Sequence, residues 1–389
     1  MDILYICAPP LLDYSVEQIN NLKLQVDLHV LITVFLHSPN HSIFKIKKDQ
    51  VIASGIYSFN EVKGQIENAS LFGNYFENCK SVNFVFFSQK LGINILLTNL
   101  KLIKLVQKIK PQIIHFDDIS GRLTILALLL RNKKIVLNVH DPEQHSGEHD
   151  WKTKLIRKLL FRKISAFCTF SNFSSSLLEK IYSPTVPICR LRLVPYKSYL
   201  YFENKLVPGI DKLPNEKILL FFGRISQYKG LDELLVIFAK LIKRFKNVKL
   251  VVAGKGSYQY QIPPELVGSS SLILINRFIL QNEIKSIFEQ ADVLVCPYRD
   301  ATQSGVLMTA AIFKTPVIVS NVGALPEYIS DGVNGYIYDI NDDLGLENAI
   351  LKFLINNAFP NSNDKTTINH DVSNNSKLLF NVYSKILDN

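Results

Sequence analysis

Cysteine is scarce in this chain, and its five residues are scattered. There is no Cys-x-x-Cys pair and no Cys/His cluster, so the sequence indicates neither a disulfide framework nor a zinc site. No apolar run reaches membrane-spanning length, because Lys, Asn or Asp interrupts the longest of them. Met1-Asp2 leads straight into an apolar segment without a basic region or a cleavage site, which argues against a secretory signal. These absences lead us to expect a cytoplasmic protein.

The composition is that of a globular protein, with 47% hydrophobic and 20% charged residues. A length of 389 residues is too great for one ordinary core, so two domains are expected. The net charge of +10 raises the question of a nucleic-acid partner. No helix-turn-helix, zinc-finger or aromatic-basic RNA signature accompanies the charge, so nucleic acid ranks last among the candidate partners.

The densest basic run is WKTKLIRKLLFRK, Trp151 to Lys163, which contains no acid. As a helix it would place Trp151 and four aliphatic residues on one side. Lys154, Arg157, Lys158 and Arg162 would gather on the other. Such a basic amphipathic helix can lie on anionic lipid, and it can equally be an ordinary domain helix with a basic outer face.

Strand-like and helix-like segments alternate along most of the chain, except for a less regular stretch before Leu91. Near-continuous apolar strands separated by helices are typical of parallel sheets covered on both faces. The pattern lapses between Tyr196 and Glu216, the best linker candidate, and then restarts. We therefore predict two doubly wound α/β domains, over residues 1–200 and 201–370. Residues 371–389 would form a last helix that packs back on the first domain.

Polar and charged residues cluster where the predicted strands end. In doubly wound sheets ligands bind beyond these carboxyl ends, so the pattern favours a ligand cleft between the two domains. The clustered residues are His115 to Asp118, His140-Asp141, Gly223-Arg224, Gly254 to Gly256, Arg277 and Tyr298 to Asp300.

The most informative segment is ILLFFGRISQYKGLDELL, Ile218 to Leu235. An apolar strand runs into Gly223-Arg224, and a short turn then delivers Lys229-Gly230 and opens an amphipathic helix. Backbone N–H groups, the helix dipole and two cations would converge there, which suits an anion such as phosphate. The alternative is an ordinary strand-to-helix turn with two solvated cations.

Residues Glu216 to Asp339 resemble the C-terminal half of the GT-B glycosyltransferases, specifically the large retaining family four. The motifs that carry the resemblance are FGRISQYKGLDELL, VVAGKGS, NRFILQNEIKSIFEQADVLVCPY and KTPVIVSNVGALPEYISDGVNGYIYD. The N-terminal half resembles the family more loosely, through IIHFDD and NVHDPEQHSGE. The resemblance implies transfer of a sugar from a nucleoside diphosphate to an acceptor hydroxyl, with retention of configuration.

The resemblance also implies roles for individual residues on the donor side. Arg224 and Lys229 match the family's diphosphate-binding pair and would neutralise the departing phosphate. Gly223 belongs to that turn, and Gly254 and Gly256 would let the backbone approach the nucleotide. Arg277 and Phe278 lie in the loop that holds the nucleobase in the family. The resemblance also implies metal-independent chemistry without a cofactor, and the lack of an Asp-x-Asp pair at a strand end is consistent with this.

One departure from the family concerns two glutamates, whose positions here are occupied by Ala301 and Thr309. The segment between them follows a Thr-Gln-Ser-Gly pattern. It would still present helix N-terminal amides to phosphate or sugar oxygens, and Thr309 could bond a ribose hydroxyl. A second departure is the first turn, CAPPLLDYSVEQ, which lacks the usual glycine pair. The donor-binding set of this segment is Gln303, Ser304, Gly305, Val306 and Thr309.

Acceptor-side candidates come from the first domain. His140 ends a predicted strand and matches the family's histidine that faces the sugar across the cleft. Asp141 and His145 follow it closely, and His115 ends the preceding strand. The alternative for each histidine is a structural role, bonded to the backbone at a strand end.

These observations together favour a transferase acting on a glycan or a lipid-linked acceptor in cell-surface polysaccharide synthesis. Its location would be cytoplasmic, peripheral on the inner face of the cell membrane. A non-catalytic GT-B sugar-nucleotide-binding partner protein is the alternative, because both family glutamates are missing. A UDP-sugar 2-epimerase on the same fold is a third reading, which the segment from Gln303 to Thr309 does not favour.

Overall fold

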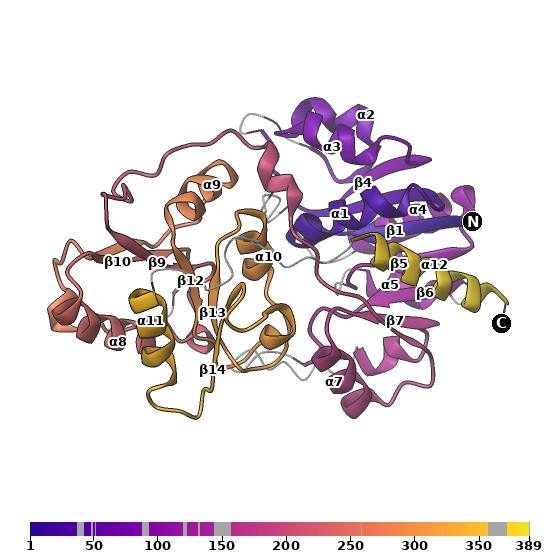
Figure 1. Ribbon diagram of the computed structural model, residues 1–389. Coiled ribbons are helices and arrows are strands. Elements are labelled where there is room, and N and C mark those ends of the chain that lie inside the picture. Colours follow the sequence, from indigo (N-terminus) through magenta and orange to yellow (C-terminus); the bar gives the residue numbers. More distant parts are fainter. Residues whose placement is uncertain are drawn as a thin grey trace. The chain divides into compact units, whose positions relative to one another are not determined.

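The computed structural model describes residues 1–36, 43–47, 50, 52–87, 93–119, 123–130, 133–143, 157–257, 259–356 and 372–388. The chain divides into two compact units. Among the described residues, the first unit runs to Val194 and includes the C-terminal helix, and the second runs from Pro195 to Asn356. Each unit contains one sheet (Figure 1).

The sheet of the first unit has the strand order β3-β4-β2-β1-β5-β6-β7-β8. All neighbouring strands are parallel except β3, which pairs antiparallel with β4. The central strands are almost fully buried, as expected for a sheet covered on both faces. The strands are β1 (Asp2–Cys7), β2 (Asp27–Phe35), β3 (Gly55–Ser58), β4 (Ser81–Phe87), β5 (Ile113–Phe116), β6 (Lys134–Asn138), β7 (Ala166–Thr169) and β8 (Ile188–Arg190).

Helices cover both faces of this sheet. α4, α5, residues 157–161 and α7 contribute leucines to one buried cluster with the sheet, so they share a face. α12, from the far end of the chain, packs against α1 and touches β8 (Figure 1). The helices of this unit are α1 (Leu12–Leu22), α2 (Phe59–Val62), α3 (Ala69–Phe76), α4 (Ile93–Ile109), α5 (Thr124–Leu129), α7 (Asn172–Tyr182) and α12 (Val372–Asp388), with 3₁₀ turns η1 (Pro9–Leu11) and η2 (Lys63–Gln65).

The second unit has a fully parallel sheet in the order β11-β10-β9-β12-β13-β14. Its core is a cluster of aliphatic and aromatic side chains between the sheet and the helices α8 and α11. The strands are β9 (Lys217–Phe222), β10 (Val248–Ala253), β11 (Leu272–Ile275), β12 (Val293–Cys296), β13 (Val317–Ser320) and β14 (Gly335–Tyr338). The helices are α8 (Leu231–Arg244), α9 (Gln281–Gln290), α10 (Gly305–Ile312) and α11 (Gly345–Asn356), with 3₁₀ turns η3 (Lys197–Tyr201), η4 (Gln227–Lys229), η5 (Pro264–Leu266) and η6 (Leu325–Tyr328).

Three segments differ from the sequence-based expectation. The less regular stretch before Leu91 contains a full strand, β4, whose first residues are only half-buried. Helix α11, which the sequence analysis did not include, packs on β14 and α8. The expected linker contains η3 and is bonded to α9, where the Lys205 amide donates to the Asn282 carbonyl at 2.7 Å. None of the helices the structure describes is long and apolar enough to cross a membrane.

Candidate functional site

The predicted phosphate turn in the second unit depends on three glycines at the ends of β9 and β10. Gly223 has a φ of 106° and Gly254 a φ of 155°, where side chains are strained. A Cβ on Gly254 would stand 1.8 Å from the Gly223 carbonyl oxygen, and one on Gly256 would stand 2.0 Å from that of Ile225. The two strand ends therefore approach each other so closely that only glycine fits.

Lys229 stands over this turn. Its side chain is 7% exposed, and its Nζ donates to the Tyr298 hydroxyl at 3.2 Å and lies 4.8 Å from the centre of that ring. A Cβ on Gly223 would come within 3.2 Å of Nζ, so the ammonium sits directly at the end of β9. Burial lowers the pKa of Lys229 to about 8; the nearby Arg224 charge adds to this, while Cys296 opposes it.

Among the described residues, no carboxylate forms an ion pair with Lys229. A buried cation is costly unless it is paired, and burial of the ammonium next to a second cation disfavours its charged form. Arg224 is exposed one residue beyond Gly223. Lys229 and Arg224 thus make the end of β9 electropositive, while most backbone amides of the turn donate to carbonyls within the unit.

The start of α10 borders the same turn. The Val306 side chain would lie 3.1 Å from a Cβ on Gly223, and a Cβ on Gly305 would lie 2.8 Å from the Tyr196 hydroxyl. Ser304 is buried at the N-cap of α10, and Gln303 precedes it. The predicted juxtaposition of the Thr-Gln-Ser-Gly segment and the phosphate turn is therefore present in the second unit.

The two positions that lack the family's glutamates are both occupied by packed side chains. Ala301 is buried, and its carbonyl accepts from the Ala324 amide at 3.2 Å. The Thr309 hydroxyl donates to the Gly305 carbonyl at 3.1 Å, one helical turn earlier. Its proton is thereby used inside α10, so toward a ribose it can act as an acceptor only.

The predicted nucleobase loop follows β11. Arg277 forms a bidentate ion pair with Glu283 at 2.7 and 3.0 Å, and Glu283 also accepts from the Leu280 amide. Asn276 Oδ1 accepts from the Gly256 amide at 3.2 Å, which ties this loop to the phosphate turn. Phe278 is 50% exposed beside them. Arg277 shapes the loop, and Phe278 presents a ring on which a base can stack.

In the first unit, His140 lies directly beyond β6 and belongs to a buried carboxylate network. Its Nε2 is 3.3 Å from Oδ1 of Asp117, which is completely buried. Asp117 also accepts from the Asn138 amide at 2.6 Å and from the Ser15 hydroxyl. The imidazole stacks on Phe170, with 4.7 Å between ring centres. The ring is therefore fixed in position and orientation.

Asp117 and His140 each stabilise the charged form of the other. For Asp117, burial raises the pKa most, but hydrogen bonds from His140, Ser15 and Asn138 outweigh it, and the pKa lies below its usual value. For His140, burial lowers the pKa most, but the bond to Asp117 and its charge, with help from Asp118 and Asp141, raise it above the usual value. The imidazolium–carboxylate form is favoured.

His115 occupies a different position from the one expected of an acceptor-side residue. It is fully buried, with Nε2 2.8 Å from Asn138 Oδ1 and Nδ1 2.5 Å from the Tyr383 hydroxyl in α12. Burial lowers its pKa to about 4, so it is neutral at pH 7. Because Asn138 Oδ1 can only accept, Nε2 carries the proton and Nδ1 accepts from Tyr383. A continuous chain of hydrogen bonds thus runs from α12 to the carboxylate that holds His140.

The remaining acceptor-side residues are less informative. The Asp141 carbonyl accepts from Arg157 at 2.8 Å, which turns that arginine toward the loop after β6. His145 lies outside the described residues, as do residues 151–156 of the predicted basic helix. The sequence analysis placed Asp117 and Tyr298 among the polar residues at strand ends without giving them a role, and it did not name Ser15, Asn138 or Tyr383. Only Asp117 and Tyr298 had a local signal, since both follow strand ends.

The fold defined by these two units is the GT-B class that the sequence predicted. The catalytic domain of starch synthase IV from Arabidopsis thaliana, solved with ADP and acarbose, superposes with a TM-score of 0.69. The superposition covers 100% of both chains at 11% sequence identity. Identity this low establishes the fold and nothing further.

Sequence comparisons match part of the chain to known glycosyltransferases. Residues 216–356 match the family model described as "Glycosyl transferases group 1". An uncharacterized glycosyltransferase of Methanocaldococcus jannaschii is 30% identical over 251 residues, which cover 57% of this chain and 63% of the relative. The alpha-monoglucosyldiacylglycerol synthase of Streptococcus pneumoniae is 32% identical over 153 residues, 39% of this chain and 34% of that one. The chain thus spans less than two thirds of either relative.

Proposed function

We propose that this protein is a glycosyltransferase that moves a sugar from a nucleoside diphosphate to an acceptor hydroxyl, with retention of configuration. The observation that carries the proposal is the buried ammonium of Lys229, without an ion-pair partner among the described residues, beside Arg224 at the end of β9. The family match over residues 216–356 supports it, because it covers that site.

In this proposal the bond between the sugar C1 and the β-phosphate oxygen breaks, and its electron pair leaves with the phosphate. Lys229, Arg224 and the amides at the start of α10 stabilise the charge that appears there. The acceptor oxygen bonds to C1, and its proton leaves with the departing phosphate. Phe278 stacks on the base. We also propose that the reaction is independent of metal ions, because the cations Lys229 and Arg224 would stabilise the leaving diphosphate.

We assign His140 to the hydroxyls of the transferred sugar. The Asp117 carboxylate raises the pKa of His140 against the effect of burial, which favours the protonated, donating ring, and Asp117 holds its orientation. Asp141 lies beside it on the same loop. We propose a glycan or lipid-linked acceptor of cell-surface polysaccharide synthesis, and we place the enzyme in the cytoplasm at a membrane surface. The diacylglycerol glycolipid in the name of the Streptococcus pneumoniae relative supports a lipid acceptor.

A panel of nucleoside diphosphate sugars tests the proposal. The purified protein is incubated with each donor, and release of the nucleoside diphosphate is followed with and without lipid and glycan acceptors. NMR of the product sugar then reports whether the anomeric configuration is retained. Absence of turnover with every donor, together with tight nucleotide binding, would favour a second function.

That second function is a non-catalytic sugar-nucleotide-binding protein. The observation that favours it is the presence of Ala301 and Thr309 where family members carry glutamates. The fixed geometry of His140 favours the enzyme, because a binding protein has no evident use for a buried imidazolium held by Asp117.

A further inference from the structure

The helix layer on one face of the first unit combines exposed leucines with cations. We call the outer surface of α4, α5 and residues 157–163 the leucine–lysine face. On α4, Leu97 and Leu100 are 49% and 44% exposed. Leu129 of α5 is 50% exposed, and Leu159 is 52% exposed. The inner residues of these elements share one buried cluster, so their outer residues belong to the same side of the unit.

Within the part of the chain that the structure describes, acids do not pair with the cations of this face. The sequence contains no Asp or Glu over residues 78–116, 119–140 and 151–178. On α4 the exposed positions change from leucine near its start to Lys101, Lys104 and Lys108 toward its end. Lys158, Arg162 and Lys163 are exposed around Leu159. None of these six cations forms an ion pair with a residue the structure describes.

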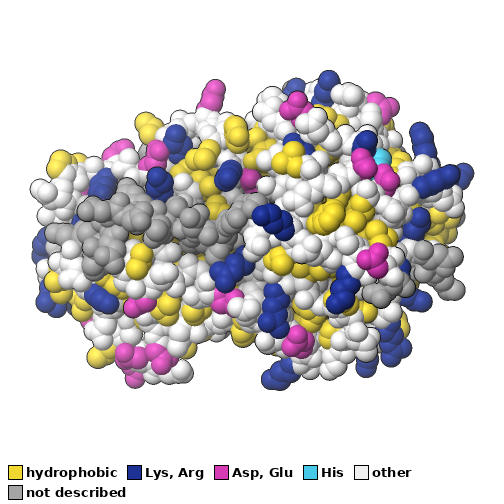
Figure 2. Space-filling model, turned by 45° about the vertical axis from the view of Figure 1, so that its right-hand side comes forward, with side chains coloured by type: hydrophobic (Ala, Val, Ile, Leu, Met, Phe, Trp, Pro, Cys, Tyr) yellow, Lys and Arg dark blue, Asp and Glu magenta, His cyan; other side chains and the backbone are white. Residues whose placement is uncertain are grey.

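Helix α8 of the second unit provides a contrast within the same chain. It begins with two acids, and its exposed lysines are paired, Lys240 with Glu347 at 3.4 Å and Lys243 with Glu265 at 3.0 Å. Lys and Arg side chains clearly outnumber acidic ones over much of the surface in Figure 2. The positive charge of the leucine–lysine face is therefore a local excess that α8 lacks.

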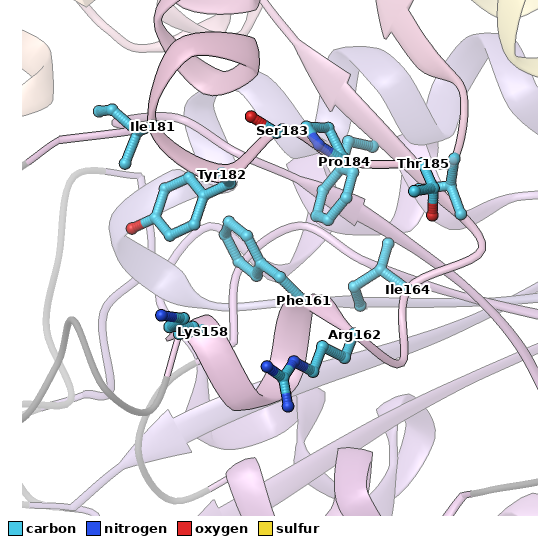
Figure 3. A pocket seen from close by; sticks show the side chains of 11 residues that line it. Lys158, Phe161, Arg162, Ile164, Ile181, Tyr182, Ser183, Pro184 and Thr185 are labelled. Carbon is cyan, nitrogen blue, oxygen red and sulfur yellow. The ribbon is translucent and has the colours of Figure 1, made fainter.

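A pocket of about 390 Å³ adjoins the cations of residues 157–163. Figure 3 shows Phe161 and Tyr182 beside each other in its wall, with Lys158 and Arg162 along one side and residues 181–185 along the other. The two aromatic rings lie 4.7 Å apart. The pocket thus adds an apolar recess next to two of the six cations.

We propose that the leucine–lysine face docks on an anionic lipid bilayer. Lysines attract the negative surface, and leucines enter the boundary between headgroups and acyl chains. A nucleic acid would be attracted by the lysines alone and would leave the leucines unexplained. The inference deepens the proposed function, because a bilayer is where a lipid-linked acceptor lies. It also enlarges the expected basic surface, since α4 and α5 were not part of it.

Vesicle co-sedimentation of the full chain tests the docking. Vesicles of phosphatidylcholine alone are compared with vesicles that also contain phosphatidylglycerol. The test variant changes Lys101, Lys104 and Lys108 to Gln, and a second variant changes Leu97 and Leu100 to Ser. The matched control changes Lys240 and Lys243 of α8 and Lys246, just beyond that helix, to Gln, which removes the same net charge from the other unit. Circular dichroism confirms that each variant is folded.

We expect binding to anionic vesicles only, weakened about a hundredfold in the α4 lysine variant, since each cation near the surface contributes a factor of about five. The leucine variant should lose binding that persists at high salt, and the α8 control should bind like the wild type. Equal losses in the α4 and α8 variants would overturn the proposal, as would an absence of binding to anionic vesicles. Binding to RNA that depends on the α4 lysines, without vesicle binding, would also overturn it.

Hydrolysis of a water-soluble donor separates this proposal from the proposed function. The α4 lysine variant should hydrolyse nucleoside diphosphate sugar in solution at the wild-type rate. Vesicle binding without donor turnover would leave the docking intact and contradict the transferase. Donor turnover without vesicle binding would support the transferase and contradict the docking.

Discussion

Lys229 is the residue on which the proposed diphosphate site depends most. Its ammonium is buried under Tyr298 at the end of β9, and burial next to Arg224 lowers its pKa to about 8. A protein that only needed to fill this space could use an uncharged residue. A bound diphosphate would restore the pKa and supply the anion that the described residues do not.

Replacing Lys229 or Arg224 with Ala should reduce turnover by about a hundredfold or more, since each contributes charge stabilisation in the transition state. Initial rates with a saturating soluble donor measure the effect. Lys240→Ala, on the exposed face of α8, is the control and should behave as wild type. Near-normal rates in a folded Lys229→Ala protein would remove the diphosphate assignment.

The lowered pKa of Lys229 also predicts a pH dependence. Because the ammonium loses its proton as pH rises through about 8, nucleoside diphosphate affinity of the free protein should be full below that value and fall above it. Titration calorimetry from pH 6.5 to 9.5 would follow this. Lys229→Arg keeps its charge throughout and should flatten the profile. A wild-type affinity that is constant over this range would contradict the assignment.

For Thr309 we predict a smaller effect on nucleotide binding. If its oxygen accepts from a ribose hydroxyl, Thr309→Val should weaken nucleotide binding by about 1 kcal/mol, the contribution of one neutral hydrogen bond. The same change removes the bond to the Gly305 carbonyl, so thermal unfolding is measured alongside binding. An unchanged dissociation constant would mean that Thr309 serves α10 alone.

Strands and helices place groups that are distant in sequence around His140. Asp117 follows β5, Asn138 ends β6, Ser15 lies in α1, and Tyr383 lies in α12. The strand ends could be predicted because apolar runs stop there. The hydrogen-bond chain could not, because nothing in the local pattern indicates that residue 383 returns to the ring of His115.

Asp117→Asn should lower the pKa of His140 below 6.5. The carboxylate charge is what outweighs burial, and without it burial of the imidazole dominates. Because the pKa of His140 is raised in the folded protein, its protonation stabilises the fold below pH 6.5, and this contribution is lost as pH rises through the folded-state pKa. NMR titration of the His140 ring measures the shift, and an unchanged pKa would contradict the pairing.

Tyr383→Phe tests whether α12 supports the network. It leaves the buried Nδ1 of His115 without its donor, which should lower the free energy of unfolding by about 1–3 kcal/mol in urea titrations. Tyr260→Phe, with a partly exposed ring in the other unit, is the control. Equal stability of Tyr383→Phe and wild type would indicate that the His115–Tyr383 bond contributes nothing.

Across the whole molecule, the repeating strand–helix pattern was enough to predict two Rossmann-like sheets, and the motifs of the second half carried the resemblance to the GT-B class. β4 was missed because it lies within the stretch before Leu91 that looked irregular, and α11 was missed because it directly precedes a polar, Asn-rich tail. In the second unit the motifs are local, so Gly223, Lys229 and the start of α10 could be named from sequence, and the structure brings them together. In the first unit the site is assembled from long-range contacts, and only His140 and its neighbours could be named in advance.

The net charge of +10 also has a location that the sequence only partly indicated. The basic run from Trp151 to Lys163 drew attention because it is dense. The lysines of α4 are spaced along a helix whose leucines look like core residues in sequence, and their exposure becomes visible only once the buried face of α4 is known. Exposed leucines, and cations that pair with none of the described acids, thus coincide on one layer of helices.

The most direct measurement for the central claim is calorimetric titration of nucleoside diphosphates and their sugars into three proteins. These are the wild type, the Arg224→Ala/Lys229→Ala double variant and the Lys240→Ala control. We predict that at least one nucleoside diphosphate binds the wild type and the control equally. The double variant should bind it at least about a hundredfold more weakly, since two charge-assisted contacts to phosphate are lost. A wild-type protein that binds none of them, or a double variant that binds as tightly as the control, would contradict the account.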